Sequence, residues 1–198
     1  MPTLLETLAG QLTGTRTAQM SQAIGADQAA TQKALQAAHP LLLAALAKNA
    51  TNRQGAEALH QAVARDHDGS LLQNLDGYIA RPDTQTGDGI LRHVLGAKRP
   101  AVEAGISKAS GLDSKGVATM MASLAPLVMG MLGQTQRQQN LDAPGLAQML
   151  QGEQRQVAAS APGLGGLARL LDSDNDGQIT DDLAKIGGKL LGGLFGKR

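Results

Sequence analysis

The sequence predicts an all-α protein made of two repeated small helical units, followed by a C-terminal acidic loop and a helix. Three observations lead to this prediction. Apolar residues recur at helical spacing along most of the chain, and no run alternates as a half-buried strand would. One stretch of the first half recurs in the second half. An acidic stretch near the C-terminus has the aspartate spacing of a calcium-binding loop.

Composition limits how a core can be built. Hydrophobic residues make up 42% of the 198 residues, but the chain has only one tyrosine, one phenylalanine and no tryptophan. Because aromatic side chains bury the most surface per residue, packing must rely on Leu, Ala, Met, Ile and Val. The chain has no cysteine, which excludes disulfides and thiolate–zinc sites. Its formal net charge of +1 gives no strong attraction to polyanions.

The N-terminus, MPTLLETLAGQLTG, does not have the features of a secretory signal. It carries Glu6 and lacks both a basic start and a long apolar run. No stretch approaches the roughly 18 apolar residues that a membrane-spanning helix requires. We therefore expect a cytoplasmic protein without a membrane span. Leucines at helical spacing predict a first helix, which Gly10 and Gly14 weaken: Leu4, Leu5, Leu8 and Leu12.

The segment 20–46 aligns without a gap with the segment 106–132. Each copy has a glycine that predicts a left-handed helix end, and an aspartate two residues later that predicts the N-cap of the next helix. A proline follows within an apolar run, where it either kinks that helix or starts another. The identical pairs are Ser21/Ser107, Ala23/Ala109, Gly25/Gly111, Asp27/Asp113, Pro40/Pro126, Leu41/Leu127 and Leu46/Leu132.

Polar stretches without helical periodicity separate the units. ARPDTQTGDG (80–89) and GQTQRQQNLDAPG (133–145) are predicted to be loops, because they are rich in Pro, Gly and polar residues. We therefore predict three parts: a first helical unit over 1–80, a second over 87–152, and the acidic loop with an amphipathic helix over 163–198.

The acidic stretch DSDNDGQITDDL (172–183) matches most of the calcium-loop pattern. Aspartates occupy its first, third and fifth positions, a glycine the sixth, and a glutamine offers its backbone carbonyl at the seventh. Leu183 stands at the twelfth position, where a carboxylate normally closes the cage, so calcium affinity should be weak. The aspartate one residue earlier is the candidate for that closing ligand. The predicted metal ligands are Asp172, Asp174, Asp176, Gln178 and Asp182.

A second interpretation needs no metal. The same stretch can be an acidic turn that caps a helix from about Thr180, because carboxylates near a helix N-terminus are favourable by themselves. A faint copy, ARDHDGSLLQNL (64–75), has an alanine at its first position and leaves only Asp66 and Asp68 as ligands. Capping of a helix from Ser70 accounts for this copy better than metal binding does.

No catalytic pattern emerges from the chain. The four histidines are far apart in sequence and form no i, i+4 pair, and neither H-E-x-x-H nor G-x-S-x-G is present. The stretch GLGGLARL (163–170) lacks the Gly-Lys-Ser/Thr of a phosphate-binding loop. We therefore expect no enzyme, and a hydrolase assembled from distant residues is only the third alternative. The histidines are His39, His60, His67 and His93.

Glycine and aspartate placed around small helices resemble a bacterial family known as domain of unknown function 937. The residues that carry the resemblance are DHDGSLLQNLDGYI (66–79), GDGILRHVLGAKRPAVEAGISKASGLD (87–113) and LLDSDNDGQITDDLAKIGGKLLGGLFG (170–196). The resemblance implies small bundles of the homeodomain-like helix-turn-helix type. It implies no activity, and it brings no catalytic residues to transfer.

Helix-turn-helix-like units raise the alternative of a DNA-associated protein. The second helix of such a unit must offer basic or amide side chains to the DNA groove. The two copies offer one lysine each and no arginine, so DNA is not expected as a partner. The candidates are Gln28, Gln32 and Lys33 in the first copy, and Ser114, Lys115, Thr119 and Ser123 in the second.

The last stretch, LAKIGGKLLGGLFGKR, has an aliphatic stripe at helical spacing between lysines. It can pack on its own domain or on a second chain, or lie at a membrane surface. We therefore predict a non-enzymatic binding or assembly module, with a homo-oligomer or another protein as partner and the acidic loop as a structural calcium site. The stripe consists of Leu183, Ile186, Leu190 and Leu194.

Overall fold

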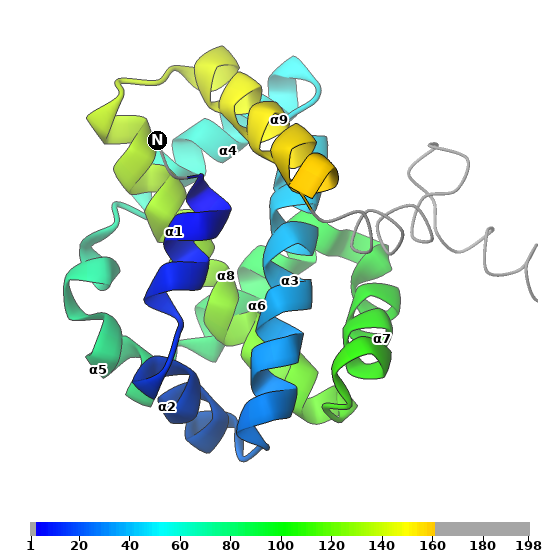
Figure 1. Ribbon diagram of the computed structural model, residues 1–198. Coiled ribbons are helices and arrows are strands. Elements are labelled where there is room, and N and C mark those ends of the chain that lie inside the picture. Colours follow the sequence, from blue (N-terminus) through cyan, green and yellow to red (C-terminus); the bar gives the residue numbers. More distant parts are fainter. Residues whose placement is uncertain (1–2, 161–198) are drawn as a thin grey trace, which may run out of the picture.

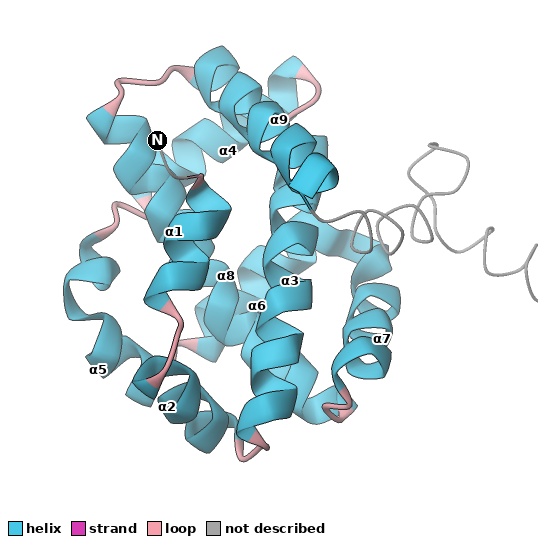
Figure 2. Ribbon diagram, viewed as in Figure 1, coloured by secondary structure: helices cyan, strands magenta, loops and turns pink. Residues whose placement is uncertain are grey.

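The computed structural model of the chain describes residues 3–160 (Figure 1). This part consists of helices joined by short connections and contains no strand (Figure 2), which confirms the predicted all-α fold. The predicted acidic loop and C-terminal helix, residues 163–198, lie outside the described residues. In chain order the elements are α1 (Leu4–Gln11), α2 (Thr15–Ile24), α3 (Gln28–Asn49), α4 (Arg53–Arg65), the 3₁₀ helix η1 (Ser70–Asn74), α5 (Leu75–Ala80), α6 (Thr84–Leu95), the 3₁₀ helix η2 (Gly96–Lys98), α7 (Arg99–Ser110), α8 (Ser114–Gln138) and α9 (Ala143–Ser160).

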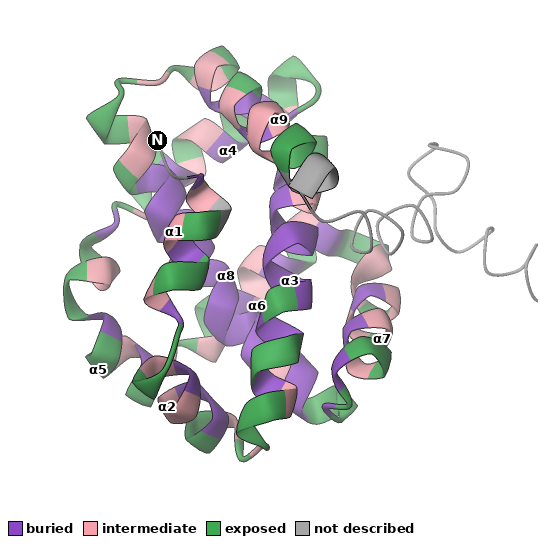
Figure 3. Ribbon diagram, viewed as in Figure 1, coloured by how far each residue is buried: buried purple, intermediate pink, exposed green. Residues whose placement is uncertain are grey.

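Helix α8 runs through the centre of the bundle, and α3 lies beside it (Figure 3). From Gly116 to Gly133, every residue of α8 is buried except two that are half-buried. By length and composition, this segment is apolar and long enough to cross a membrane. The expectation that no stretch reaches that length was therefore wrong. Since 89% of the segment's most apolar window is buried inside the bundle, its hydrophobicity is explained by its place in the core.

The glycines and aspartates shared by the two aligned segments have the predicted geometry at the helix ends. Gly25 ends α2 with a φ of 67°, and Gly111 ends α7 with a φ of 78°, both in the left-handed region. The Asp27 carboxylate accepts the amide N–H of Ala30 at 2.9 Å, and Asp113 caps α8 in the same way at 2.6 Å. These local predictions are confirmed, because each depends only on residues that are neighbours in sequence.

The two shared prolines do not start new helices. Pro40 lies inside α3 and Pro126 inside α8, and each helix continues on both sides of its proline. The alternative in which a proline begins a third helix is therefore wrong. Both prolines are buried, so their rings pack in the core. Each proline also leaves its helix without one backbone N–H donor.

Helices from the two halves of the chain pack together around one core. Helix α3 of the first half contacts α7 and α9 of the second, and α8 of the second half contacts α4 and α1 of the first. The buried aliphatic side chains from α1 to α9 form one continuous cluster. Each long helix therefore buries its surface partly against the other half of the chain.

The two predicted loops are shorter than expected. Helix α6 begins at Thr84, inside the predicted loop 80–89, with the Asp83 carboxylate capping the amide of Thr86 at 3.0 Å. Helix α8 continues to Gln138, so only four residues of the stretch 133–145 connect it to α9. Both predictions were wrong because polar residues on the exposed side of a helix, together with helical glycines, look like a loop in sequence.

The glycines of these helices serve close packing. A Cβ atom added at Gly87 of α6 would overlap the carbonyl oxygen of Ala122 in α8. One added at Gly133 of α8 would overlap the carbonyl oxygen of His67, in the turn after α4. Backbone therefore contacts backbone at both places, and no side chain fits between the segments.

We expect Gly87→Ala to destabilise the protein by about 2–3 kcal/mol, because the new methyl group must push α6 away from α8. Gly89→Ala is the matched control in the same helix, because a Cβ atom added there meets nothing within 4 Å. It should leave stability unchanged or raise it by about 0.5–1 kcal/mol. Urea denaturation followed by circular dichroism measures both, and equal midpoints for the two variants would contradict this account of the α6–α8 contact.

Candidate functional site

A groove of about 800 Å³ lies between the C-terminal end of α3, helix α4 and helix α6. Its buried aliphatic residues come from three different helices, and polar side chains surround them. Concave sites with apolar linings and a few polar groups are typical of ligand binding. The apolar lining consists of Leu46, Ala58, Leu59, Ala62, Ile90, Val94 and Met129, and the polar lining of Asn49, Asn52, Gln54, Asp66, His67, Thr86 and His93.

Two asparagines fix the end of this groove. The Asn49 side chain donates a hydrogen bond to the carbonyl oxygen of Val94 at 2.8 Å, which ties the end of α3 to the end of α6. Asn52 caps α4 by accepting the amide N–H of Gly55 at 2.8 Å. A Cβ atom added at Gly55 would overlap the carbonyl oxygen of Asn49, so the turn from α3 into α4 is as tight as the backbone allows.

The lining carries little charge. Asp66 forms an ion pair with Arg65 at 2.7 Å, and the hydrogen bond from Arg65 lowers the pKa of this carboxyl below its ordinary value. Burial lowers the pKa of the half-buried His67 below 6.5, against the smaller opposing effect of Asp66, so His67 is neutral at pH 7. No lysine or arginine lines the groove. Anionic ligands therefore find no counter-charge in its lining.

The faint acidic copy (64–75) has its carboxylates engaged within the fold. Asp66 is held by Arg65, and Asp68 accepts the amide N–H of Ser70 at 2.9 Å, at the start of η1. The Arg137 side chain donates a hydrogen bond to the carbonyl oxygen of Asp68. Within residues 3–160, no three His, Asp or Glu residues lie together as metal ligands would. Asp68 therefore closes the turn that leads into η1, whereas the N-cap position of η1 is Gly69, which has no side chain to cap it.

The other histidines lie apart from the groove or at its rim. The His60 ring nitrogen Nε2 lies 3.1 Å from the carbonyl oxygen of Leu141 and 3.2 Å from the Gln136 side chain, where it joins α4 to the segment before α9. His93 is exposed at the rim, and His39 lies in the core. His67 and His93 therefore line the groove, whereas His39 and His60 lie elsewhere.

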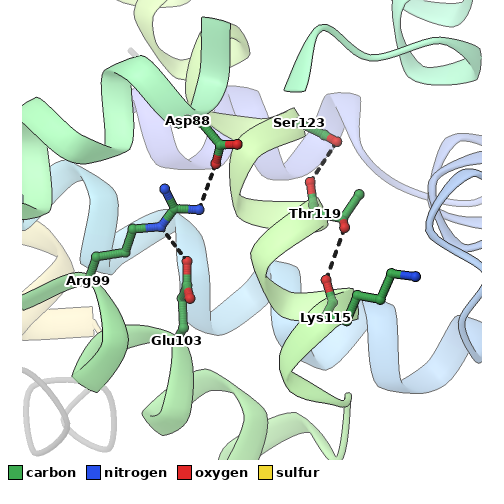
Figure 4. A network of polar contacts seen from close by, with 6 residues as sticks. All are labelled: Asp88, Arg99, Glu103, Lys115, Thr119 and Ser123. Atoms are coloured by element: carbon green, nitrogen blue, oxygen red, sulfur yellow. Dashed lines mark hydrogen bonds and ion pairs between the residues drawn. The ribbon is translucent and has the colours of Figure 1, made fainter. Parts of the chain in front are cut away.

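A further polar network connects helices without forming a site (Figure 4). Arg99 of α7 contacts Asp88 of α6 and Glu103 of α7, each at 2.6 Å. On α8, the hydroxyls of Thr119 and Ser123 donate hydrogen bonds to carbonyl oxygens one turn earlier. The Arg99–Asp88 ion pair therefore connects α6 with α7. The two hydroxyls bond only within α8, to backbone carbonyls of the preceding turn.

The predicted calcium ligands Asp172, Asp174, Asp176, Gln178 and Asp182 lie outside the described residues. The groove, by contrast, was missed from the sequence. Its lining comes from segments 46–67 and 86–94 and from Met129. No spacing in the sequence joins these segments, because only the packing of α4 and α6 on α8 brings them together.

Comparison with known proteins gives one match. Residues 6–136 match the model of a family described as bacterial protein of unknown function (DUF937). The chain belongs to this family. The match confirms the resemblance drawn from the sequence, and it includes every residue that lines the groove. It ends before α9 and before the stretch 170–196, which also suggested the family. No curated protein and no solved structure matches the chain.

His39 makes stability depend on pH. Its side chain is 3% exposed, and its Nε2 atom has no hydrogen-bond partner among the described residues. Burial lowers its pKa from 6.5 to about 4. Between about pH 4 and pH 6.5, the His39 ring is therefore neutral in the folded chain but protonated in the unfolded chain. Stability from this group is complete above pH 6.5 and is lost as the pH falls from 6.5 towards 4.

We expect the free energy of unfolding to fall by up to about 3 kcal/mol between pH 7 and pH 4. His39→Leu should remove most of this slope, and the exposed His93→Gln should retain it. His67 contributes a smaller slope of the same sign, since burial lowers its pKa too. Urea titrations at several pH values give the slope, and an unchanged slope in His39→Leu would contradict the assignment to His39.

Proposed function

We propose that this protein is a non-enzymatic binding module that holds an aliphatic helical segment of a protein partner in the groove between α3, α4 and α6. The observation that carries the proposal is the aliphatic floor of the groove. Leu46, Leu59 and Met129 form this floor and are themselves buried. Around them, the half-buried Ala62, Ile90 and Val94 expose aliphatic surface to an occupant, inside a polar, nearly uncharged rim. Covering such a floor with apolar side chains is favourable in proportion to the area removed from water.

The rim chemistry favours a peptide over a small anion. Asn49, Asn52 and Gln54 offer amide groups, which hydrogen-bond to polar groups of either kind. The lining contains one carboxylate, Asp66, and no cationic side chain to bind a carboxylate or phosphate. Amphipathic helices that place aliphatic residues at i, i+3, i+4 and i+7 in a groove are a common mode of recognition. A helix whose polar face carries lysines fits this groove best.

The candidate recognition helices are poorly placed to bind DNA. In α8, Ser123 is buried and Thr119 is half-buried, so this helix presents little surface to DNA. At the start of α3, Gln28, Gln32 and Lys33 are exposed, but they offer one positive charge. Binding to the phosphate backbone depends on several such charges.

A helical peptide with leucines at i, i+3, i+4 and i+7 and lysines elsewhere is a direct probe of the groove. The chain has no cysteine, so Ala58→Cys carries a trifluoromethyl label at a unique place in the groove. We expect the peptide to shift the ¹⁹F signal of this label saturably, at micromolar to millimolar concentration. A peptide with the same residues in scrambled order should have no such effect, because it has no aliphatic face.

The matched control is the same label on Ala64→Cys, which is also exposed on α4 but does not line the groove. Its ¹⁹F signal should not respond to the peptide. Equal shifts for the two labelled variants, or no saturable shift for Ala58→Cys, would show that the groove does not bind aliphatic helices.

We also propose that the acidic loop is a structural calcium site, with Asp172, Asp174, Asp176, Gln178 and Asp182 as its ligands. The support is the alternation of the aspartates and the glycine at the sixth position. The closely spaced aspartates repel one another, which also favours a cation. Self-association is the alternative use of the aliphatic C-terminal stripe, and sedimentation over a wide concentration range measures it.

Calcium should raise the melting temperature of the full-length protein, and a chelator should lower it. At a concentration about one hundred times the dissociation constant, binding adds roughly 2.7 kcal/mol of stability. Asp174→Ala should abolish the difference, whereas Asp66→Ala should retain it, because Asp66 is already paired with Arg65. If calorimetry at millimolar calcium detects neither heat nor a melting shift, the loop is an acidic helix cap.

A further inference from the structure

We infer that the occupant of the groove is the C-terminal stripe of the same chain: Leu183, Ile186, Leu190 and Leu194. This inference rests on the proposed function, because it takes the groove as a site for an aliphatic helix. Residues 161–198 follow α9, and the stripe is an aliphatic face, at helical spacing, that lies beyond the described part of the chain.

The charges of the two surfaces do not oppose docking. At helical spacing, Lys185 and Lys189 fall on the side of the segment away from the stripe. After Asp182 the chain has no further carboxylate side chain. The groove lining has no cation and has one carboxylate, Asp66. A docked segment therefore brings no like charge to the groove, and its lysines stay in water.

The dimensions also match. The stripe spans eleven residue steps, which is about 17 Å in an α-helix. Along α4 the groove is lined from Gln54 to Ala62, which is about 12 Å at the same rise. A helix with four aliphatic side chains on one face is therefore long enough to cover this lining.

The chain is long enough to reach the groove. Residues 161–182 connect Ser160 to Leu183, and a chain of this length extends to roughly 80 Å. A bundle of the described size is roughly 40 Å across. Tethering at this distance gives an effective concentration of up to millimolar, which favours the segment of the same chain over that of a second copy.

The glycines of the segment explain why it needs a partner surface. Gly187, Gly188, Gly192 and Gly193 each cost about 1 kcal/mol of helix stability relative to alanine, so the segment is a poor helix by itself. Docking supplies the missing stability. Glycines also allow close approach, as Gly87 and Gly133 do between the helices of the bundle.

A disulfide between Ala58→Cys and Leu190→Cys tests the inference in the full chain, where no natural cysteine competes. Mild oxidation should give an intramolecular disulfide at least tenfold faster than in the control pair Ala58→Cys and Gly192→Cys, whose second residue faces away from the stripe. Equal rates for the two pairs would overturn the inference. A disulfide-linked dimer in place of the monomeric product would assign the groove to a second copy and would also overturn it.

Competition with the leucine–lysine peptide separates this inference from the proposed function. In the chain that carries the label on Ala58→Cys, Leu190→Glu should release the segment and tighten peptide binding by about tenfold. The matched control, Gly192→Glu, adds the same charge on the opposite face and should leave the affinity unchanged. If the peptide binds all three chains equally, the inference is wrong and the groove still binds helices. If it binds none of them, the proposed function is wrong.

Discussion

The burial of α8 is the constraint on which the rest of the described structure depends. Its apolar segment from Gly116 to Gly133 lies almost wholly inside the bundle, and α1, α3, α4, α6 and α7 pack around it. A core with hardly any aromatic side chains gains its stability from many close contacts between small residues. Such contacts need short distances between helix axes, and the glycines at the contact points make those distances available.

The groove follows from two of these contacts. Gly87 places the start of α6 against Ala122 of α8, and Gly133 places the turn after α4 against α8 at His67. The two positions on α8 are eleven residues apart, which is about 17 Å along the helix. Met129 lies between them and forms part of the groove floor. The positions of Gly87 and Gly133 therefore set the distance between α4 and α6. If either helix moved towards the other, the backbone contact at its glycine would be lost.

The same physics explains what could be predicted from the sequence. The helix ends at Gly25 and Gly111 and the caps by Asp27 and Asp113 are interactions over two to three residues, so the local pattern was sufficient. Gly87 was assigned to a loop because the sequence alone does not distinguish a glycine required for close helix packing from a glycine required for a turn. The groove could not be predicted, since its residues meet only through the packing of three helices on α8. The acidic loop shows the converse case, a strong local pattern that predicts ligands without any tertiary information.

An aliphatic groove whose rim carries little charge supports a particular kind of binding. Burial of a few leucine side chains gives modest affinity, because ordering a flexible partner offsets much of the gain. Since the one carboxylate of the lining, Asp66, is already paired with Arg65, little discriminates one amphipathic helix from another. Tethering compensates for weak affinity by raising the local concentration of one partner. A segment of the same chain has this advantage over any free competitor, so a foreign helix must either bind more tightly or arrive when the segment is held elsewhere. The acidic stretch 172–182 lies directly before the stripe in the chain. A ligand that holds this stretch would therefore act directly on whether the stripe reaches the groove.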